Sequence, residues 1–232
     1  NFWGPAGTSG ACGPCSEIIY DLGPEKGCGK ADCKPGCDCF RWLEIWNLVF
    51  PQFDQQEDGT RLPLRNRGID TGMGLERLAM VVQGKDNIFE TDLFFPMIEL
   101  ISQKAGISYK QDPQKDIAMK IIADHIRALT FAIGENIIPS NEGRGYVLRR
   151  LLRRASKYGR DLGFREPFLH ELVNPVVEMM KKTYPELLEK SVAIQQVIRT
   201  EEERFLKTLD QGISLLNSLV DQARKNGHSS IP

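Results

Sequence analysis

The chain has 232 residues, of which 41% are hydrophobic, 26% charged and 8% aromatic, a composition typical of a globular protein. This excludes a disordered tail, a collagen-like repeat and a small disulfide knot, and no apolar run is long enough to span a membrane. The 30 Lys and Arg residues against 31 Asp and Glu residues exclude a globally basic nucleic-acid coat protein, but not a local basic face.

The first hundred residues begin with strand-like runs and turns. Alternation of apolar and polar residues predicts three strands, the last of them the weakest, over residues 17–20, 41–50 and 61–69. A Glu-Asp-Gly-Thr run predicts a hairpin turn at 57–60. Helical spacing then predicts a helix from Gly74 and another over about residues 91–105.

From about Pro113 the chain is predicted to be helical to its end. Residues 186–224 predict one or two long helices, with Gly212 as a candidate kink. Within them, Glu201–Glu203 is expected to be a solvated helical face. The composition changes near residue 109, which predicts a domain of residues 1–108 followed by a helical domain of residues 109–232.

All six cysteines precede residue 40, and four lie in a Gly-, Pro- and Lys-containing insert at residues 27–39. These four are Cys28, Cys33, Cys37 and Cys39. They predict a structural zinc site, because four thiolates leave no open coordination position for chemistry. Two alternatives stay open: Cys12 and Cys15 supply two of the ligands, or the insert is an exposed loop with free thiols.

The most informative segment is the strand-to-helix connection at residues 68–77. Gly72 and Gly74 permit close approach of a ligand to the backbone, and the N-terminus of the following helix favours an anion. Arg77 lies in the first helical turn, within reach of a phosphate. Asp70 has two interpretations: a ligand-binding carboxylate, or a cap for the turn.

The string Asp70-Thr71-Gly72-Met73-Gly74-Leu75-Glu76-Arg77 resembles motif 3 of the class II aminoacyl-tRNA synthetases, and of their alanyl-tRNA synthetase family in particular. Further blocks follow the order of that family and cover most of the chain. These blocks are Asn1–Gly4, Cys12–Ile18, Glu44–Phe50, Ala123–Ala128 and Gly143–Arg150.

The resemblance implies activation of alanine by ATP with Mg²⁺, and transfer of alanine to the 3′ end of its tRNA. Arg77 would hold the γ-phosphate of ATP, with Gly74 beside it, and Asp70 would pair with the α-amino group of alanine. Arg77 and Asp70 are therefore the expected catalytic residues. The expected alanine-binding residues are Trp3, Asn47, Asp70 and Gly72.

Motifs 1 and 2 of the family, the second with the arginine for the α-phosphate, are not in this sequence. The chain also starts at Asn1 without a methionine or a signal peptide. We therefore expect a missing N-terminal part of the same protein, and a chain that is inactive alone. A Mg²⁺-ligand role for Glu44 would need a bulge, because Glu44 and Asn47 point to opposite faces of a flat strand.

Residues 144–160 contain seven basic residues and no acidic one. A stripe at helical spacing is formed by Arg149, Arg153, Lys157 and Arg160, which favours contact with phosphates over the alternative of a solvated face. The resemblance assigns this block to the tRNA acceptor stem and Asn141 to its G·U base pair. The expected tRNA-binding residues are Asn141, Arg144, Arg149, Arg150, Arg153 and Lys157.

We therefore expect an α+β protein: the C-terminal part of a class II antiparallel sheet with flanking helices, followed by an all-helical tRNA-recognition domain. The expected function is alanine–tRNA ligation in the cytoplasm, with alanine, ATP and the acceptor stem of tRNA(Ala) as partners and no membrane contact. The alternatives are a non-catalytic tRNA-binding module from a truncated relative, and a zinc-stabilised interaction module.

Overall fold

The computed structural model describes residues 1–225, and the chain divides into two compact units, Asn1–Thr91 (unit 1) and Asp92–Pro232 (unit 2). This division falls earlier than the boundary expected between residues 108 and 109. The difference arises because the helix that ends at Ala105 packs against helices of unit 2. Residues 226–232 of the expected helical domain lie outside the described residues.

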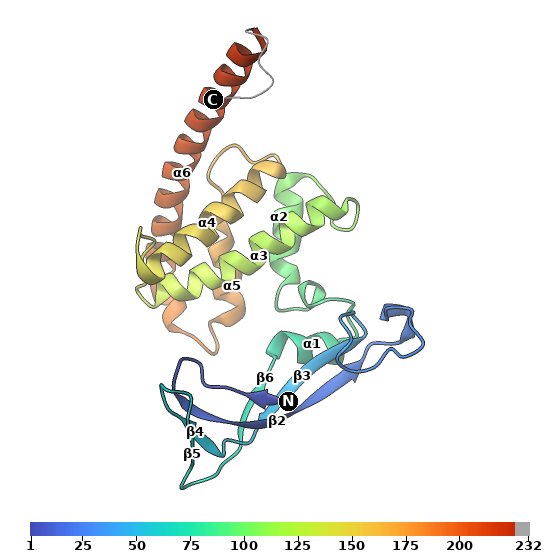
Figure 1. Cartoon of the computed structure of the whole chain (residues 1–232). Coiled ribbons are helices and arrows are strands. Elements are labelled where there is room, and N and C mark those ends of the chain that lie inside the picture. The colour runs from blue at the N-terminus through green and yellow to red at the C-terminus, as the bar shows by residue number, and fades with distance from the viewer. Residues whose placement is uncertain (226–232) are drawn as a thin grey trace. The chain divides into compact units, whose positions relative to one another are not determined.

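Unit 1 is built on a six-stranded antiparallel sheet (Figure 1). Its strands are β1 (Phe2–Trp3), β2 (Gly10–Asp21), β3 (Trp42–Val49), β4 (Phe53–Gln55), β5 (Arg61–Pro63) and β6 (Asp70–Met73). They pair in the order β5-β4-β2-β3-β6, with β1 also paired to β2, so β6 forms one edge. The antiparallel sheet, together with helices in the same chain, confirms the α+β expectation.

The strand expected over residues 17–20 is confirmed as part of β2, and the strand expected over 41–50 is confirmed as β3, one residue shorter at each end. The turn at 57–60 connects β4 to β5. The strand expected over 61–69 is shorter and ends at Pro63. Strands β1 and β4 escape prediction because two or three residues are too few for alternation to be visible.

A β-bulge interrupts the pairing of β2 with β3. The register shifts between Ile18 and Ile19, so that Ile19 lies opposite Glu44 and Ile45 is an extra residue on β3. Because one extra residue reverses the alternation of side chains, Glu44 and Asn47 lie on the same face of the sheet. The structure therefore contains the bulge that Glu44 and Asn47 need in order to face the same site.

Short helices complete unit 1: η1 (Pro24–Lys26), α1 (Leu75–Val82) and η2 (Ile88–Glu90). The helix predicted from Gly74 is confirmed as α1, with Gly74 as its N-cap. Helix α1 packs on β3, and Met80 is its buried residue.

The elements in the described part of unit 2 are α2 (Phe95–Ala105), α3 (Pro113–Gly134), α4 (Gly143–Asp161), η3 (Leu169–Leu172), α5 (Val173–Met180) and α6 (Glu186–Lys225). Helix α6 continues without interruption through Gly212, so this glycine does not end the helix, and a bend of the helix axis there stays a prediction. Among the helices within residues 1–225, none combines the length and apolar character that crossing a membrane demands.

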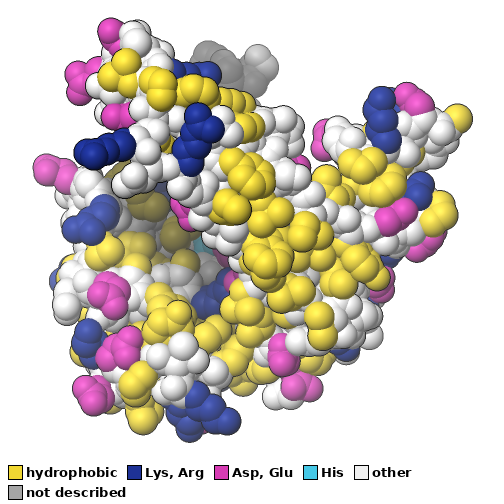
Figure 2. All heavy atoms as spheres, turned by 90° about the horizontal axis from the view of Figure 1, so that it is seen from below, with side chains coloured by type: hydrophobic (Ala, Val, Ile, Leu, Met, Phe, Trp, Pro, Cys, Tyr) yellow, Lys and Arg dark blue, Asp and Glu magenta, His cyan; other side chains and the backbone are white. Residues whose placement is uncertain are grey.

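The two units bury apolar surface to different degrees. In unit 2, α3, α4, α5 and α6 pack together around fully buried residues such as Ile122, Leu152 and Ile194. In unit 1, large hydrophobic side chains of the strands stay exposed, and Figure 2 shows hydrophobic side chains gathered on the side seen from below. The exposed residues on the strands are Phe2, Trp3, Ile18, Tyr20, Leu62 and Met73.

Candidate functional site

One face of the sheet in unit 1 collects the predicted alanine-site residues. Asn47 of β3 lies opposite Gly72 of β6, and Asp70 lies two residues before Gly72, so the three share a face. Trp3 lies opposite Gly13, and the alternation along β2 from Gly13 to the residue opposite Asn47 places Trp3 on the same face.

Asn47 differs from the other polar residues of this face. Its Oδ1 atom is buried and has no hydrogen-bond partner among the described residues. A Cβ added at Gly72 would meet no atom within 4 Å, so the space beside the amide is open. A buried acceptor without a partner costs free energy, which a bound donor such as an ammonium group would recover.

Asp70 is exposed on the edge strand β6. The N-cap of α1 is Gly74, and no side chain caps that helix by a hydrogen bond. Asp70 therefore does not cap helix α1, and its carboxylate stands on the face that Asn47 shares.

Arg77 is fixed by the backbone of β3. Its Nη1 atom donates to the Glu44 carbonyl oxygen at 2.8 Å, and the Gly74 N–H donates to the Ile45 carbonyl oxygen at 3.0 Å. A Cβ on Gly74 would lie 3.2 Å from Arg77 Cδ, so glycine leaves room for the arginine. The bulged part of β3 thus holds a helix N-terminus and an exposed guanidinium side by side, an arrangement suited to phosphate oxygens.

Two further carboxylates lie on the Asn47 face. Glu17 is directly opposite Asn47 and accepts a hydrogen bond from Asn1 Nδ2 at 2.8 Å, and the bulge brings Glu44 to the same face. Sequence reasoning misses Glu17 because the register of β2 against β3 is not visible in the sequence. Carboxylate oxygens are ligands that Mg²⁺ prefers, so this face fits a cation as well as a nucleotide phosphate.

The thiols of the insert gather in the connection between β2 and β3. The Sγ atoms of Cys28, Cys33 and Cys37 lie within 4.8 Å of one another, and Cys39 Sγ is 3.8 Å from Cys33 Sγ. Hydrogen bonds from the Cys28 backbone and from the Trp42 indole lower the pKa of Cys33 to about 7. The structure therefore brings together the cysteines that the sequence singles out.

The basic stripe of α4 is paired with acidic side chains. Arg149 Nε and Arg153 Nη2 lie 2.8 Å and 3.5 Å from Glu201 Oε1 of α6, and Lys157 Nζ lies 2.6 Å from Asp161 Oδ2. Arg149 is only 18% exposed, so this side chain is largely turned away from solvent.

Arg144 and Arg150 differ from that stripe. Both are exposed, and neither has an acidic partner among the described residues. Of the arginines that the sequence assigns to tRNA, these two present their charge to solvent without competition from a carboxylate.

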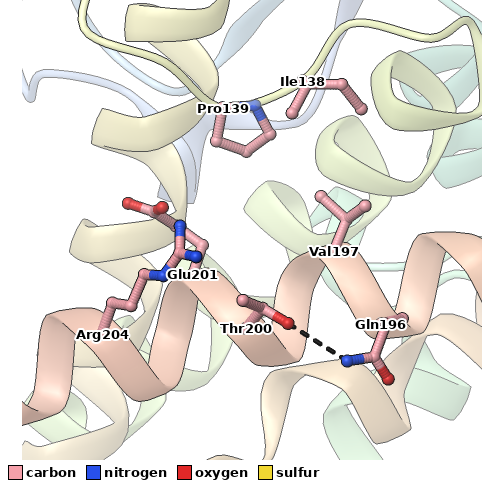
Figure 3. A pocket seen from close by; sticks show the side chains of 7 residues that line it. All are labelled: Ile138, Pro139, Gln196, Val197, Thr200, Glu201 and Arg204. Carbon is pink, nitrogen blue, oxygen red and sulfur yellow. Dashed lines mark hydrogen bonds between the residues drawn. The ribbon is translucent and has the colours of Figure 1, made fainter.

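Arg149 also fixes Asn141 in the loop before α4. Its Nη1 atom donates to Asn141 Oδ1, and its Nη2 atom donates to the Pro139 carbonyl oxygen at 3.4 Å. Asn141 is exposed and its Oδ1 already accepts this hydrogen bond, which leaves the Nδ2 group as its donor for a ligand. Glu201, Pro139 and Ile138 are among the residues that line a pocket of about 210 Å³ between this loop and α6 (Figure 3).

The expectation that Glu201–Glu203 forms a solvated face is wrong for its first two residues. Glu201 is 6% exposed and Glu202 is fully buried. Glu202 Oε2 accepts hydrogen bonds from the N–H groups of Phe168 and Leu169 at 3.1 Å and 3.0 Å, and burial raises the pKa of Glu202 to about 7.

Strand β6, the turn at Gly74 and helix α1 with Arg77 lie on an antiparallel sheet. This arrangement agrees with the protein family that the chain matches. The whole chain, residues 1–232, matches the family described as tRNA synthetases class II (A). The chain therefore belongs to the class II tRNA synthetase family.

Within that family, several curated proteins similar to this chain are alanine–tRNA ligases. Those of Desulforamulus reducens and Carboxydothermus hydrogenoformans are each 53% identical to this chain, over 231 and 232 residues, and that of Clostridioides difficile is 51% identical over 227 residues. These alignments cover 98–100% of this chain but 26% of each relative. The chain thus spans about a quarter of the length of the relatives it matches.

Proposed function

We propose that the protein containing this chain ligates alanine to its tRNA. The observation that carries the proposal is the common face of Trp3, Asn47, Asp70 and Gly72 on the sheet, in a chain 53% identical to alanine–tRNA ligases. ATP and Mg²⁺ are the cofactors that membership of the class II family implies.

Alanine would bind on this face. Its ammonium group would donate to Asn47 Oδ1 and pair with the carboxylate of Asp70, which meets the unsatisfied acceptor of Asn47. The open space over Gly72 would receive the small substrate, and Trp3 would form the aromatic wall. Adenylyl transfer needs positioning and fixed charges more than a protein nucleophile, and these residues provide both.

ATP would bind next to this face, at the start of α1. The guanidinium of Arg77, held by the Glu44 carbonyl, would pair with the γ-phosphate, and the Gly74 turn would allow close approach. The carboxylate of Glu44 is the oxygen ligand that a phosphate-bound Mg²⁺ would find on this part of β3.

The acceptor stem of the tRNA would bind along α4 in unit 2. The exposed Arg144 and Arg150, with the more exposed members of the stripe, Arg153 and Lys157, would contact phosphates. Arg149 would act through Asn141, because its own charge is engaged with Glu201. Asn141 would then read a base edge with its free Nδ2 donor.

Amino-acid-dependent ATP–pyrophosphate exchange tests the proposal. It is measured on the full-length protein and on the 232-residue chain, with each amino acid in turn. We expect exchange with alanine in the full-length protein and none in the chain alone, because the α-phosphate arginine that the family resemblance implies is not in this sequence.

Two results would contradict parts of the proposal. Absence of exchange with any amino acid, in a folded full-length protein that binds tRNA, would favour the non-catalytic tRNA-binding module. Exchange with a different amino acid would retain the ligase but remove alanine as its substrate.

A further inference from the structure

We propose that the connection between β2 and β3 holds a structural zinc ion on the thiolates of Cys28, Cys33, Cys37 and Cys39. Four sulfur atoms at about 2.3 Å from a tetrahedral ion lie about 3.8 Å from one another. Cys33 Sγ and Cys39 Sγ are 3.8 Å apart, and the Sγ atoms of Cys28, Cys33 and Cys37 are mutually within 4.8 Å. Three of the sulfurs therefore already stand close to the spacing of a zinc tetrahedron, and the fourth, on Cys39, lies in contact with one of them.

Two of these sulfurs accept hydrogen bonds from N–H donors. The backbone N–H of Lys34 donates to Cys37 Sγ at 3.4 Å, and the indole Nε1–H of Trp42 donates to Cys33 Sγ at 3.3 Å. Such donors stabilise the negative charge of thiolates and orient them, the role that outer partners play around bound metals. Free thiols in a solvated loop would not need this arrangement.

The backbone folds around the cluster through two left-handed glycines. Gly29 has φ +74° and Gly36 has φ +93°, conformations that side-chain-bearing residues rarely adopt. Hydrogen bonds from Cys33 N to Lys30 O and from Cys37 N to Lys34 O close the turns that carry two of the thiols.

The connection lacks an apolar core of its own. No residue from 22 to 41 is buried in the described structure, and Phe40 is 87% exposed. A segment of this length without a core is usually stabilised by a disulfide or a metal ion. The sulfur spacing and the N–H donors favour the metal.

Cys12 and Cys15 are not part of this site. Both lie within the extended strand β2, three residues apart, where side chains point to opposite faces, and Cys12 is fully buried. The alternative in which they complete the zinc coordination is therefore not supported by the geometry.

A zinc ion here would act on the hairpin that carries the alanine-binding face. Trp42, which donates to Cys33, is the first residue of β3, and Arg41 binds Asp21 at the end of β2 by two hydrogen bonds of 2.7 Å. The ion would fix the far end of the β2–β3 pair. A closed site with four thiolates has no open position, so its role is structural.

Metal analysis of the full-length protein, purified under reducing conditions without chelators, tests the inference. We expect Cys28→Ser, Cys37→Ser and Cys39→Ser each to contain one zinc equivalent fewer than the parent protein. Cys15→Ser is the matched control and should retain the full zinc content. Comparison with the parent separates this site from any other zinc in the protein.

Cobalt substitution gives a second readout, which reports the ligands of the bound metal directly, already in the parent protein, instead of the amount of metal retained. Co²⁺ bound in place of zinc should show thiolate-to-metal charge-transfer absorption that weakens in Cys39→Ser and stays unchanged in Cys15→Ser. Equal zinc content in the parent and the three insert variants would overturn the proposal. Loss of the metal in Cys15→Ser would also overturn it, by moving the site to β2.

Discussion

In the proposed alanine site, Asn47 and Asp70 would bind the ammonium group in different ways. Asn47 offers a neutral acceptor that is already desolvated, since its Oδ1 is buried without a partner among the described residues. Asp70 offers a full charge at the exposed edge of the sheet. The first residue is suited to orientation and the second to electrostatic attraction.

Replacement of Asp70 by Asn tests that division. Asp70→Asn removes the charge that would face the ammonium and keeps the shape, so alanine-dependent exchange in the full-length protein should fall about 100-fold or more. The affinity for tRNA should not change. Asp58→Asn, in the β4–β5 turn, is the control and should behave like the parent. Unchanged exchange in Asp70→Asn would remove this residue from the alanine site.

Glu201 is the buried carboxylate that holds Arg149, and through it Asn141. We expect Glu201→Gln to loosen the arginine, so that Asn141 no longer has one fixed orientation. Discrimination between tRNA acceptor stems that differ in one base pair should then fall about tenfold, the scale of one base contact. The measurement is the ratio of kcat/KM for two such stems.

Glu203→Gln is the matched control for that experiment. Glu203 lies two residues further along α6, is exposed, and pairs with Arg199 at 2.9 Å. It should leave the ratio unchanged. Because a ratio for two substrates is independent of the amount of folded enzyme, a loss of stability in Glu201→Gln cannot imitate the expected result. Equal ratios in both variants would show that Glu201 has only a structural role.

At the scale of elements, basic residues of α4 that look solvent-facing in the sequence are paired with acidic residues of α6 in the structure. Arg149 and Arg160 of α4 have side chains only 18% and 17% exposed, because Glu201 and Asp210 of α6 pair with them. In the sequence these acids lie about fifty residues away, and the stripe resembles a free basic face. Part of the stripe stabilises the helix pair instead.

Helix α6 also holds η3 through Glu202, and this contact should make stability depend on pH. Burial raises the pKa of Glu202 in the folded state to about 7 from 4.5, so ionisation above pH 7 places a charge in the interior. The contribution of this carboxyl to folding stability is therefore lost as pH rises from 4.5 to 7, by roughly 3 kcal/mol at most.

Glu202→Gln keeps an oxygen acceptor for the Phe168 and Leu169 N–H groups and removes the titration. Its free energy of unfolding should rise relative to the parent at pH 8, and the two proteins should converge near pH 5. Denaturant unfolding at both pH values measures this, with Glu203→Gln as the exposed control. A parent protein and Glu202→Gln variant with parallel pH profiles would contradict the expectation.

For the whole molecule, the features that can be predicted from the sequence are those that depend on local periodicity or on a short motif. Strands β2 and β3, the helix from Gly74 and the gathering of the insert cysteines all follow from short segments. The bulge at Ile45, the position of Glu17 opposite Asn47 and the pairing of Arg149 with Glu201 do not, because each depends on which distant segments pack together. Register and long-range ion pairs are set by tertiary structure alone.

The open edge of the sheet has a practical consequence for work with the isolated chain. In the described structure β6 pairs with β3 on one side only, its four residues are all exposed, and Asp70–Met73 contains no Pro or Lys to discourage pairing. An unprotected edge of this kind recruits strands from neighbouring molecules, and the exposed apolar side chains of the sheet add to the attraction. The isolated chain should therefore self-associate at high concentration. Working at low concentration would keep it monomeric, as a binding assay requires.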